Sequence, residues 1–377
     1  MSRLVALDLP GGELFKTVVS KVWEQGNALV VVPQRLTEDG REKYLADIGP
    51  HQVVGPDGVL RDYRPDGAEL AEGDALVVCS SGTTGHPKQI VHTMAGLSAH
   101  CRMVHSRLGL DRCSDKWLAC LPLDHLGGFG VVARSLIDDV TLMVVDGFDA
   151  DVVSNAPNDN NVTLTSLVPT VLDRVDTTPY RHVLVGGSAD RETRPANIVH
   201  TYGSTETGGG VVYQGKPLDG VEIRLGANNL IEICSPTIGR GLRNDDGSVS
   251  ALPSQSGWLT TQDIGRWDQQ GNLEILGRND DLIITGAENV WPAPIEELLL
   301  RRDDVADAMV MGVDDDIWGQ RVIAFIVANP GSEPPSLADI RGYVSNVLGP
   351  AHAPREIRFV GELARGSLGK LQRNNPA

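Results

Sequence analysis

The sequence is poor in the residues that build metal centres and disulfide-rich folds. Its 377 residues include five cysteines, and no two of them have the C-x-x-C spacing of a zinc or redox site. The odd number also argues against a disulfide framework, so we expect reduced thiols that pack as small hydrophobic side chains. The nine histidines are scattered, without an H-E-x-x-H pattern. These absences exclude the usual zinc motifs and a small disulfide-stabilised protein.

Positive charge is also scarce. The chain has 33 lysines and arginines against 50 aspartates and glutamates, which gives a formal net charge of −17 at pH 7. Nucleic acids and anionic membranes bind basic surfaces, so we expect neither to be the main partner. An anionic small molecule would have to be bound by a few local cations.

Long apolar runs are missing as well. No stretch approaches the ~18 consecutive apolar residues of a membrane span, and Asp8 and Pro10 interrupt the N-terminal segment MSRLVALDLPGG. We therefore expect a cytoplasmic protein without membrane insertion. Hydrophobic residues make up 41% of the chain, which suits a globular protein with a large core. The length predicts two or three domains.

Short β-rich runs, in contrast, are frequent. Between residues 28 and 203 they alternate with helical or irregular segments, which predicts an α/β domain with a mainly parallel sheet. The runs are ALVVV (28–32), ALVVC (75–79), KWLACL (116–121), TLMVV (141–145), VTLTSLV (162–168), HVLVGG (182–187) and IVHTYG (198–203).

The pattern changes near residue 210. From there to about residue 277, runs such as VEIRL, LIEIC and LEIL are separated by turn residues, which predicts antiparallel hairpins in a small barrel-like sub-domain. After GRNDD (277–281), strands and helices alternate over roughly a hundred residues, a usual domain size. We therefore expect a large N-terminal domain, residues 1–277, and a small C-terminal α+β domain, residues 278–377.

A polar loop, SSGTTGHPK (80–88), follows the run that ends at Cys79. The apolar residues after Ile90 recur at helical spacing, so we expect the loop to join a strand to a helix. Such junctions hold phosphates through backbone N–H groups, hydroxyls and a lysine. The loop is not a Walker loop, because Pro87 precedes its lysine and Gln89 follows it. The candidate phosphate-binding residues are Ser81, Gly82, Thr83, Thr84, Gly85 and Lys88.

A second candidate site is TYGSTETGGG (201–210). The simplest interpretation is a glycine-rich turn with a surface carboxylate. A functional interpretation is that Tyr202 stacks on a flat base, Thr205 binds a phosphate and Glu206 holds magnesium. The glycines at 208–210 would then leave a space without side chains, into which a substrate could fit.

Three further residues have both a structural and a functional interpretation. Asp263 could be a turn aspartate, or its carboxylate could accept hydrogen bonds from both hydroxyls of a ribose. Arg278 could be an ordinary surface arginine, or it could contact the same sugar. Lys370, in GSLGKL (366–371), could belong to a frayed tail, but the flanking glycines and leucines suit a lysine that places one charge on a substrate.

In this order, the motifs resemble those of the adenylate-forming enzymes, which include acyl- and aryl-CoA synthetases, peptide-synthetase adenylation domains and luciferases. The resemblance runs from about residue 75 to residue 370 and rests on SSGTTGHPK, LPLDHLGGFG, TYGSTE, WLTTQDIG with GRNDDLI, and GSLGKL. It implies an α/β fold: a large domain of mainly parallel sheets with a barrel-like sub-domain, then a small mobile α+β domain. It also implies that ATP, Mg²⁺ and coenzyme A are used.

The resemblance implies how ATP would be bound. The loop 80–88 would hold the phosphates, Gly187 and Tyr202 would flank the adenine, and Glu206 would help bind magnesium. Gln89 and Gln262 depart from the family pattern, but neither replaces an expected ligand.

Four more roles follow from the same resemblance. Asp263 and Arg278 would bind the ribose. Lys370 would serve the first half-reaction, in which the carboxylate attacks ATP. Asp280 would be the hinge about which the two domains rotate.

The acyl group is expected between LDHLGGFG (123–130) and TGGG (207–210), because both follow predicted strands and their glycines would leave room for a flat ring. Gly208 and Gly209 would line the site, and His125 would line the ring pocket. Arg134, with Lys216 as a second candidate, would neutralise a second carboxylate of the substrate. Arg134 could equally form a salt bridge on a helix surface.

We therefore expect an ATP-dependent ligase that activates an aryl carboxylic acid as its acyl-adenylate and transfers the acyl group to CoA. One alternative is a ligase for another acid, or one that delivers to a carrier protein. Another is a nucleotide sensor without turnover, which the joint presence of Glu206, Asp263 and Lys370 disfavours. The expected partners are a small carboxylate, ATP and CoA, without nucleic acid, and a homodimer is left open.

Overall fold

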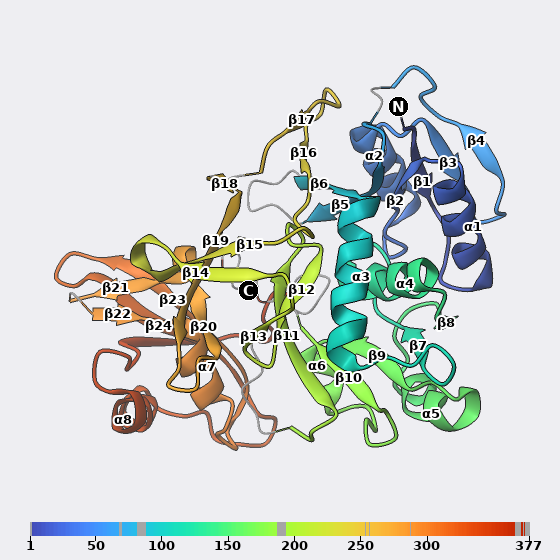
Figure 1. The fold of residues 1–377 in the computed structure, drawn as a ribbon. Helices are drawn as coiled ribbons and strands as arrows, with labels where there is room; N and C mark the ends of the chain where they lie inside the picture. Colours follow the sequence, from blue (N-terminus) through green and yellow to red (C-terminus); the bar gives the residue numbers. More distant parts are fainter. Residues whose placement is uncertain are drawn as a thin grey trace. The chain divides into compact units, whose positions relative to one another are not determined.

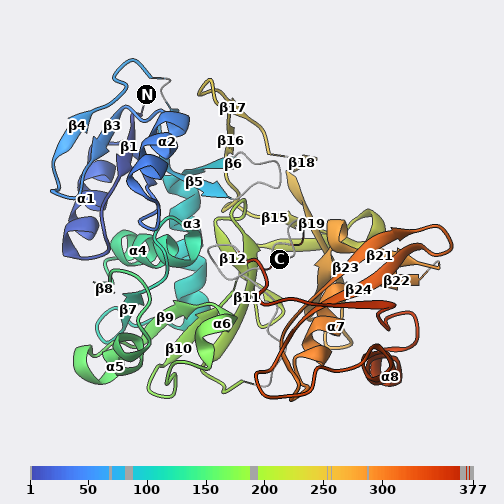
Figure 2. The same cartoon turned by 180° about the vertical axis from the view of Figure 1, so that it is seen from behind.

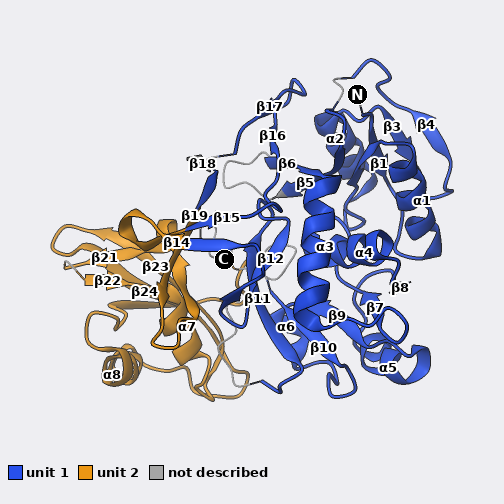
Figure 3. Ribbon diagram, in the orientation of Figure 1, with its two compact units in different colours: residues 1–223, 232–260 blue, residues 224–231, 261–377 orange. Residues whose placement is uncertain are grey.

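The protein divides into two compact units (Figure 3). The computed structural model describes residues 2–67, 70–80, 88–186, 194–252, 254–255, 257–286, 288–365, 371 and 373. The first unit comprises residues 1–223 and 232–260, and the second comprises residues 224–231 and 261–377. The second unit thus includes residues 261–277, which the sequence-based division assigned to the large domain. A domain boundary at residue 277 stays a prediction.

The first unit contains an eight-stranded sheet with a parallel centre. Its strands are β1 (Leu4–Leu7), β2 (Ala28–Val31), β3 (Gln52–Val54), β4 (Leu60–Asp62), β5 (Asp74–Ser80), β6 (Lys88–Thr93), β16 (Gly241–Arg243) and β17 (Val249–Ser250). They lie in the order β17-β16-β6-β5-β2-β1-β3-β4. Strands β5, β2, β1 and β3 run parallel, and antiparallel partners extend the sheet at both ends. All residues of β1 and β2 are buried, as expected for strands covered on both faces.

A seven-stranded sheet forms the second half of this unit. Its strands are β7 (Lys116–Ala119), β8 (Thr141–Val144), β9 (Leu164–Leu167), β10 (His182–Val185), β11 (Ile198–Ser204), β12 (Gly209–Tyr213) and β13 (Lys216–Pro217). The order is β13-β12-β11-β10-β9-β7-β8, and the strands from β11 to β8 are parallel neighbours. The expectation of a mainly parallel α/β fold is therefore confirmed.

Helices separate the two sheets and cover their outer faces (Figures 1 and 2). The helices of this unit are α1 (Glu13–Glu24), α2 (Glu38–Ile48), α3 (Met94–Leu108), α4 (Leu126–Asp138), α5 (Ala150–Asn160) and the short α6 (Pro169–Leu172). Helix α1 contacts both β2 and β8, and α3 contacts β5, β6 and α4. Phe15 and Trp23 of α1 meet Phe129 of α4 edge to face, with ring centroids 6.4 and 5.9 Å apart. No helix in the described ranges has the length and apolar character needed to cross a membrane.

The polar loop at residues 80–88 does not lead directly into a helix, so that prediction is wrong. Strand β6 intervenes and pairs antiparallel with β5, with Ser80 opposite Lys88. Ile90 and Val91 are fully buried in the sheet, and this burial favours a strand over an early start of α3. Helix α3 then begins after Thr93, whose hydroxyl accepts a hydrogen bond from the Gly96 N–H at 3.1 Å. The loop therefore connects two paired strands.

The antiparallel hairpins expected between residues 210 and 277 are present, but they are shared among three sheets. Strand β12 belongs to the seven-stranded sheet, and β16 and β17 belong to the eight-stranded sheet. The remaining strands form a five-stranded sheet in the order β14-β15-β19-β18, with β20 paired to β19. They are β14 (Glu222–Leu225), β15 (Leu230–Cys234), β18 (Ser254–Gln255), β19 (Trp258–Trp267) and β20 (Leu273–Arg278).

The C-terminal part of the second unit is the expected small α+β arrangement (Figure 2). It has the strands β21 (Ile283–Thr285), β22 (Glu288–Val290), β23 (Val305–Asp315), β24 (Gly319–Ala328) and β25 (Glu356–Phe359), and the helices α7 (Pro292–Leu299) and α8 (Leu337–Leu348). The sheet order is β22-β21-β24-β23, and β25 pairs with β24. Ile295 of α7 and Ile340 of α8 pack on one face of this sheet. Phe325 and Leu371 lie in a separate cluster.

Candidate active site

The predicted phosphate-binding residues are only partly covered by the structure. Lys88 is exposed at the first position of β6. Ser81, Gly82, Thr83, Thr84 and Gly85 lie outside the described residues, as do Gly187 and Lys370. Their roles stay predictions.

Tyr202, Thr205 and Glu206 are brought together on the hairpin formed by β11 and β12. A bulge between Tyr202 and Gly203 shifts the register of the two strands, and residues 205–208 form the turn. The main chain of this turn is held from outside the hairpin, because the Gly239 N–H donates to the Glu206 carbonyl at 2.8 Å. Glu206 therefore extends from a backbone whose position is fixed.

Thr207, which sequence reasoning did not select, holds the turn from within. It is completely buried, and its hydroxyl accepts from the Ser204 N–H and donates to the Gly209 carbonyl, both at 2.8 Å. Thr237 in turn donates to the Thr207 carbonyl at 2.7 Å. The S-T-E-T pattern could have indicated this role, because threonine side chains commonly bond to the backbone within turns.

The glycines of this hairpin are required by close packing. A β-carbon on Gly203 would lie 2.0 Å from the Gly209 carbonyl oxygen. Gly209 has a φ of +123°, and a β-carbon there would lie 3.0 Å from the His100 ring. Side chains are therefore excluded at both positions, by the opposite strand and by α3.

His100 is a second residue that sequence reasoning missed. Its Nε2 donates a hydrogen bond to the Gly210 carbonyl at 2.9 Å. Burial, together with the positive charge of Arg134, lowers the pKa of His100 to about 3. The ring is therefore neutral at pH 7. The sequence offered a signal, because His100 is three residues after Leu97 and four before Val104, on the apolar side of the predicted helix.

Arg134 lies inside the protein, so the interpretation as a surface salt bridge is wrong. It is 4% exposed, and its guanidinium lies over the Trp117 ring at 4.7 Å. Nη2 donates to the Ser166 hydroxyl at 3.4 Å, and Nε has no hydrogen-bond partner among the described residues. Burial lowers the pKa of Arg134, but an arginine in a protein keeps its charge.

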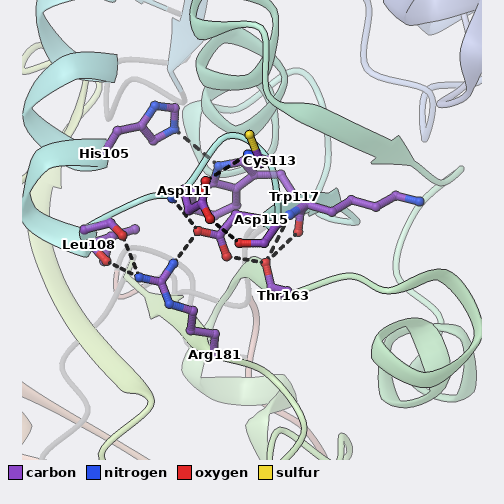
Figure 4. A network of polar contacts seen from close by, with 11 residues as sticks. His105, Leu108, Asp111, Cys113, Asp115, Trp117, Thr163 and Arg181 are labelled. Carbon is purple, nitrogen blue, oxygen red and sulfur yellow. Dashed lines mark hydrogen bonds and ion pairs between the residues drawn. The ribbon is translucent and has the colours of Figure 1, made fainter.

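A polar network supports the Trp117 side of this cluster (Figure 4). The Trp117 indole N–H donates to Nε2 of His105 at 3.3 Å, and Nδ1 of His105 is 2.6 Å from the Asp138 carboxylate. Nearby, the buried carboxylate of Asp115 pairs with Arg181 and accepts from the Thr163 hydroxyl at 2.8 Å. These contacts tie the end of α3 to the strands that carry Trp117 and Ser166.

No carboxylate within the described ranges forms an ion pair with Arg134. The carboxylate on its own helix, Asp138, binds His105 and Arg112 instead. Burying an arginine without a counter-ion costs free energy, because its hydration is lost without an equivalent attraction. An anionic group that reached Arg134 would recover part of that loss.

His125 lies at the N-terminal end of α4, the helix that also carries Arg134. Its Nε2 is 3.4 Å from the Asp124 carboxylate, which binds Arg35 at 2.7 Å. Burial lowers the pKa of His125, and the Asp124 charge opposes this effect. A role of His125 in the ring pocket stays a prediction.

The glycines of LDHLGGFG lie in the first turns of α4 rather than in an open loop. A β-carbon on Gly128 would be 2.4 Å from the Leu121 carbonyl oxygen, so Gly128 is needed for helix packing. Room for a ring beside the other two glycines stays a prediction. The second candidate cation, Lys216, lies on the short strand β13, where its carbonyl accepts from Arg107 at 3.4 Å.

Asp263 and Arg278 are brought together in the second unit. They lie opposite each other on the antiparallel strands β19 and β20. The guanidinium of Arg278 forms a two-point contact with Asp280, with Nε–Oδ1 and Nη2–Oδ2 distances of 2.8 and 2.9 Å. This contact raises the pKa of Arg278. The predicted ribose ligands are therefore neighbours, and one of them binds the predicted hinge residue.

The donor groups at Glu206 fit a magnesium ion that is bound together with a nucleotide. Within the described ranges, no three histidine, cysteine, aspartate or glutamate side chains are arranged to hold a metal ion. Magnesium commonly binds one or two carboxylates and completes its coordination with phosphate oxygens and water. A single carboxylate on a fixed turn is the contribution that such a site needs from the protein.

Comparisons with known proteins define the class. Residues 54–244 match the AMP-binding enzyme family, and residues 294–370 match the AMP-binding enzyme C-terminal domain. The chain belongs to the AMP-binding enzyme family, and the resemblance to adenylate-forming enzymes is confirmed.

Several of the similar proteins have the same substrate in their names. A probable 2-succinylbenzoate–CoA ligase of Mycobacterium tuberculosis is 38% identical over 330 residues, which cover 81% of this chain and 85% of that protein. The o-succinylbenzoate CoA synthetase of Bacillus subtilis in complex with its acyl-adenylate intermediate has a TM-score of 0.83 and 26% identity, over 99% of this chain and 87% of the other. The same synthetase with ATP and magnesium gives a TM-score of 0.83 and 25% identity, over 99% and 88% of the two chains.

Proposed function

We propose that this protein is an ATP-dependent 2-succinylbenzoate–CoA ligase that acts in menaquinone biosynthesis. In the first step a substrate carboxylate attacks the α-phosphorus of ATP and releases pyrophosphate. In the second step the CoA thiol attacks the acyl-adenylate carbonyl, the thiol proton is lost, and AMP leaves. Membership of the AMP-binding enzyme family and the substrate named for the relatives support this assignment.

The observation that carries the substrate assignment is the buried, unpaired cation of Arg134. 2-Succinylbenzoate has two carboxylates, and only one of them becomes the acyl-adenylate. The other stays charged and needs a cation away from water. His100 lies between Arg134 and the glycine hairpin: its ring donates to the Gly210 carbonyl, and it interacts electrostatically with Arg134.

The nucleotide would be bound by the residues that the motifs predict. Tyr202 would stack on the adenine, Thr205 would bind a phosphate, and Glu206 would hold magnesium with the phosphates. Asp263 and Arg278 would bind the ribose. Magnesium, when bound, neutralises phosphate charge so that one anion can attack another. The chain's own groups supply orientation and further positive charge.

Two lysines would divide the remaining charge stabilisation. Lys370 would bridge the attacking carboxylate and the nucleotide during adenylation, and Lys88 would contact the departing pyrophosphate. Lys370→Ala should therefore lower the adenylation rate roughly a hundredfold or more, because a charge-assisted contact is lost in that transition state. With synthetic acyl-adenylate and CoA, the same variant should approach the wild-type rate. Lys88→Ala should have the same pattern with a weaker defect.

Arg134→Met tests the substrate assignment. Methionine keeps an apolar side chain of similar length and removes the charge, so thermal stability should be unchanged or higher. The KM for 2-succinylbenzoate should rise about 10- to 100-fold, because a charged hydrogen-bond partner is lost. Benzoate, which lacks the second carboxylate, serves as the comparison substrate, and its activity should not change.

Either of two outcomes would contradict this role. An unchanged KM for 2-succinylbenzoate would show that another cation binds the second carboxylate. An equal loss of activity with both acids would assign Arg134 a structural role. Arg134→Lys is the matched control, since it keeps the charge and should retain part of the preference for the dicarboxylate.

A panel of carboxylic acids separates this proposal from the alternatives. Pyrophosphate release is measured with each acid, and mass spectrometry detects the CoA thioester. Pyrophosphate release without the thioester would indicate delivery to a carrier protein, and preference for another acid would assign that acid as the substrate. The absence of pyrophosphate release with every acid would favour a nucleotide sensor. We also propose a cytoplasmic location and leave a homodimer as a prediction that sedimentation velocity can test.

A further inference from the structure

The last described residues of the chain are fastened to the second unit on both sides of the GSLGK segment. Leu371 forms an antiparallel bridge with Arg365, and its side chain joins the cluster around Phe325 and Leu363. Arg365 binds both carboxylate oxygens of Asp307, at 2.7 Å each. Residues 366–370, with the predicted catalytic lysine, connect these two paired ends.

Arg373 makes a more extensive set of contacts. Its guanidinium binds both oxygens of the Glu296 carboxylate, with an Nη2–Oε2 distance of 3.0 Å. Nη1 also donates to the Val310 carbonyl at 2.8 Å, and Nε is 3.3 Å from the Asp281 carboxylate. One side chain thus joins helix α7, strand β23 and the turn that contains Asp281.

The buried charges of Arg373 and Glu296 are paired with each other and hydrogen-bonded to the backbone. The Glu296 carboxylate also accepts from the Val310 N–H at 2.7 Å, so both carboxylate oxygens are bonded. Burial alone would lower the pKa of Arg373, but its bonds to Glu296 and the charge of Asp281 raise it above the ordinary value. A two-point contact between a guanidinium and a carboxylate also fixes orientation.

The positions of the residues that Arg373 binds indicate a role beyond stability. Asp281 is the residue directly after the predicted hinge, Asp280. Lys370 is three residues before Arg373, so chain geometry keeps their Cα atoms within about 11 Å of each other. Any rotation at residue 280 must carry the lysine to its substrate without loss of precision, since a shift of about 1 Å can cost about a hundredfold in rate.

We propose that Arg373 is a positioning residue for the first half-reaction: it fastens the chain next to Lys370 to Glu296 and Asp281, so that the lysine moves with the first turn after the hinge. This inference depends on the proposed function, because it assumes that Lys370 contacts the substrate during adenylation. It predicts that Arg373 affects the rate of adenylation and not the rate at which CoA attacks the acyl-adenylate.

The test compares the two half-reactions in Arg373→Ala. Pyrophosphate release with 2-succinylbenzoate and ATP should slow roughly ten- to a hundredfold, mainly in kcat, because the lysine is misplaced after substrates have bound. Thioester formation from synthetic acyl-adenylate should stay within about threefold of the wild type. Arg373→Lys should recover part of the first rate, because lysine retains the charge but cannot bind Glu296 at two points.

Arg302→Ala is the matched control. Arg302 forms a similar two-point pair with Asp304 in the same unit, at 2.8 and 2.5 Å, and among the described residues it does not bond to Asp281 or Glu296. It should leave both half-reactions near the wild-type rate.

A double-mutant cycle identifies the link to the hinge. If Arg373 acts through Asp281, Asp281→Asn should slow adenylation, and adding it to Arg373→Ala should give less than the product of the two separate effects. If the two substitutions slow adenylation independently, so that their effects multiply, the role assigned to Asp281 is wrong.

The outcomes separate this inference from the proposed function. An active wild type with an unaffected Arg373→Ala would overturn the inference alone, and so would equal losses in both half-reactions. A wild type that releases no pyrophosphate with any carboxylic acid would overturn the proposed function, and this inference with it.

Discussion

Replacing Gly209 by alanine should destabilise the first unit by an amount that the structure divides into two parts. The residue has a φ of +123°, a region that is nearly restricted to glycine, and adopting it costs other residues about 1–3 kcal/mol. The new β-carbon would also lie 3.0 Å from Cε1 and 3.2 Å from Nε2 of the His100 ring. Such overpacking typically costs a further ~1–3 kcal/mol. We therefore expect a loss of about 2–6 kcal/mol in the free energy of unfolding.

Gly73→Ala is the control that isolates the backbone part. Gly73 belongs to the same unit and has a φ of +87°, but no atom lies within 4 Å of the position its β-carbon would occupy. Its replacement should cost about 1–2 kcal/mol, as expected for alanine at a positive φ. Urea unfolding of both variants, followed by tryptophan fluorescence, gives the difference.

Removing His100 should relieve the crowding. In a double-mutant cycle, His100→Ala and Gly209→Ala should be less damaging together than the sum of their separate effects, by about 1–2 kcal/mol. Equal costs for Gly209→Ala and Gly73→Ala, together with no coupling to His100, would refute the close packing of α3 against the hairpin. Adenylation should also slow in Gly209→Ala, since the same hairpin carries Glu206.

Three further results are expected. Because burial lowers the pKa of His92 to about 4 and of His100 to about 3, stability should fall as the pH drops from about 6.5 toward these values, by about 1.4 kcal/mol per pH unit for each histidine. His100→Gln keeps a donor for Gly210 and should reduce this slope by one proton, and an unchanged slope would contradict the assignment. Arg181→Ala should cost about 2–4 kcal/mol in urea unfolding, because the Asp115 carboxylate, which is 2% exposed, is left without its counter-ion, and Asp115→Ala should cost less because the arginine left behind is 39% exposed. Asp280→Pro, by restricting φ, should change the rates of the two half-reactions by different factors, and equal changes would count against a hinge at this residue.

The local sequence was sufficient for most of the architecture. Alternating apolar runs such as ALVVC and HVLVGG became β5 and β10 because strand formation depends mainly on short-range patterns of burial. The spacing of apolar residues after Met94 likewise predicted α3. Strand β1, at residues 4–7, was missed because its apolar run is short and stands alone at the N-terminus.

The motifs predicted the chemistry for a related reason. Residues such as Tyr202, Thr205 and Glu206 lie close together in sequence, so one hairpin is enough to bring them together. Asp263 and Arg278 are further apart, but a single antiparallel pairing places them opposite each other. The sequence by itself therefore determined the family, the general fold and the candidate nucleotide ligands.

Tertiary structure decided everything that depends on contacts between distant segments. Arg134 had two interpretations in the sequence, and its burial against Trp117 and Ser166 excluded the surface salt bridge. The contact of His100 with Gly210 and the contacts of Arg373 with Glu296 join residues that are 110 and 77 positions apart. No local pattern specifies such pairs, because they form only when packing has fixed which faces of the helices and strands meet, and the free energy of a buried charge depends on those neighbours rather than on the residue itself.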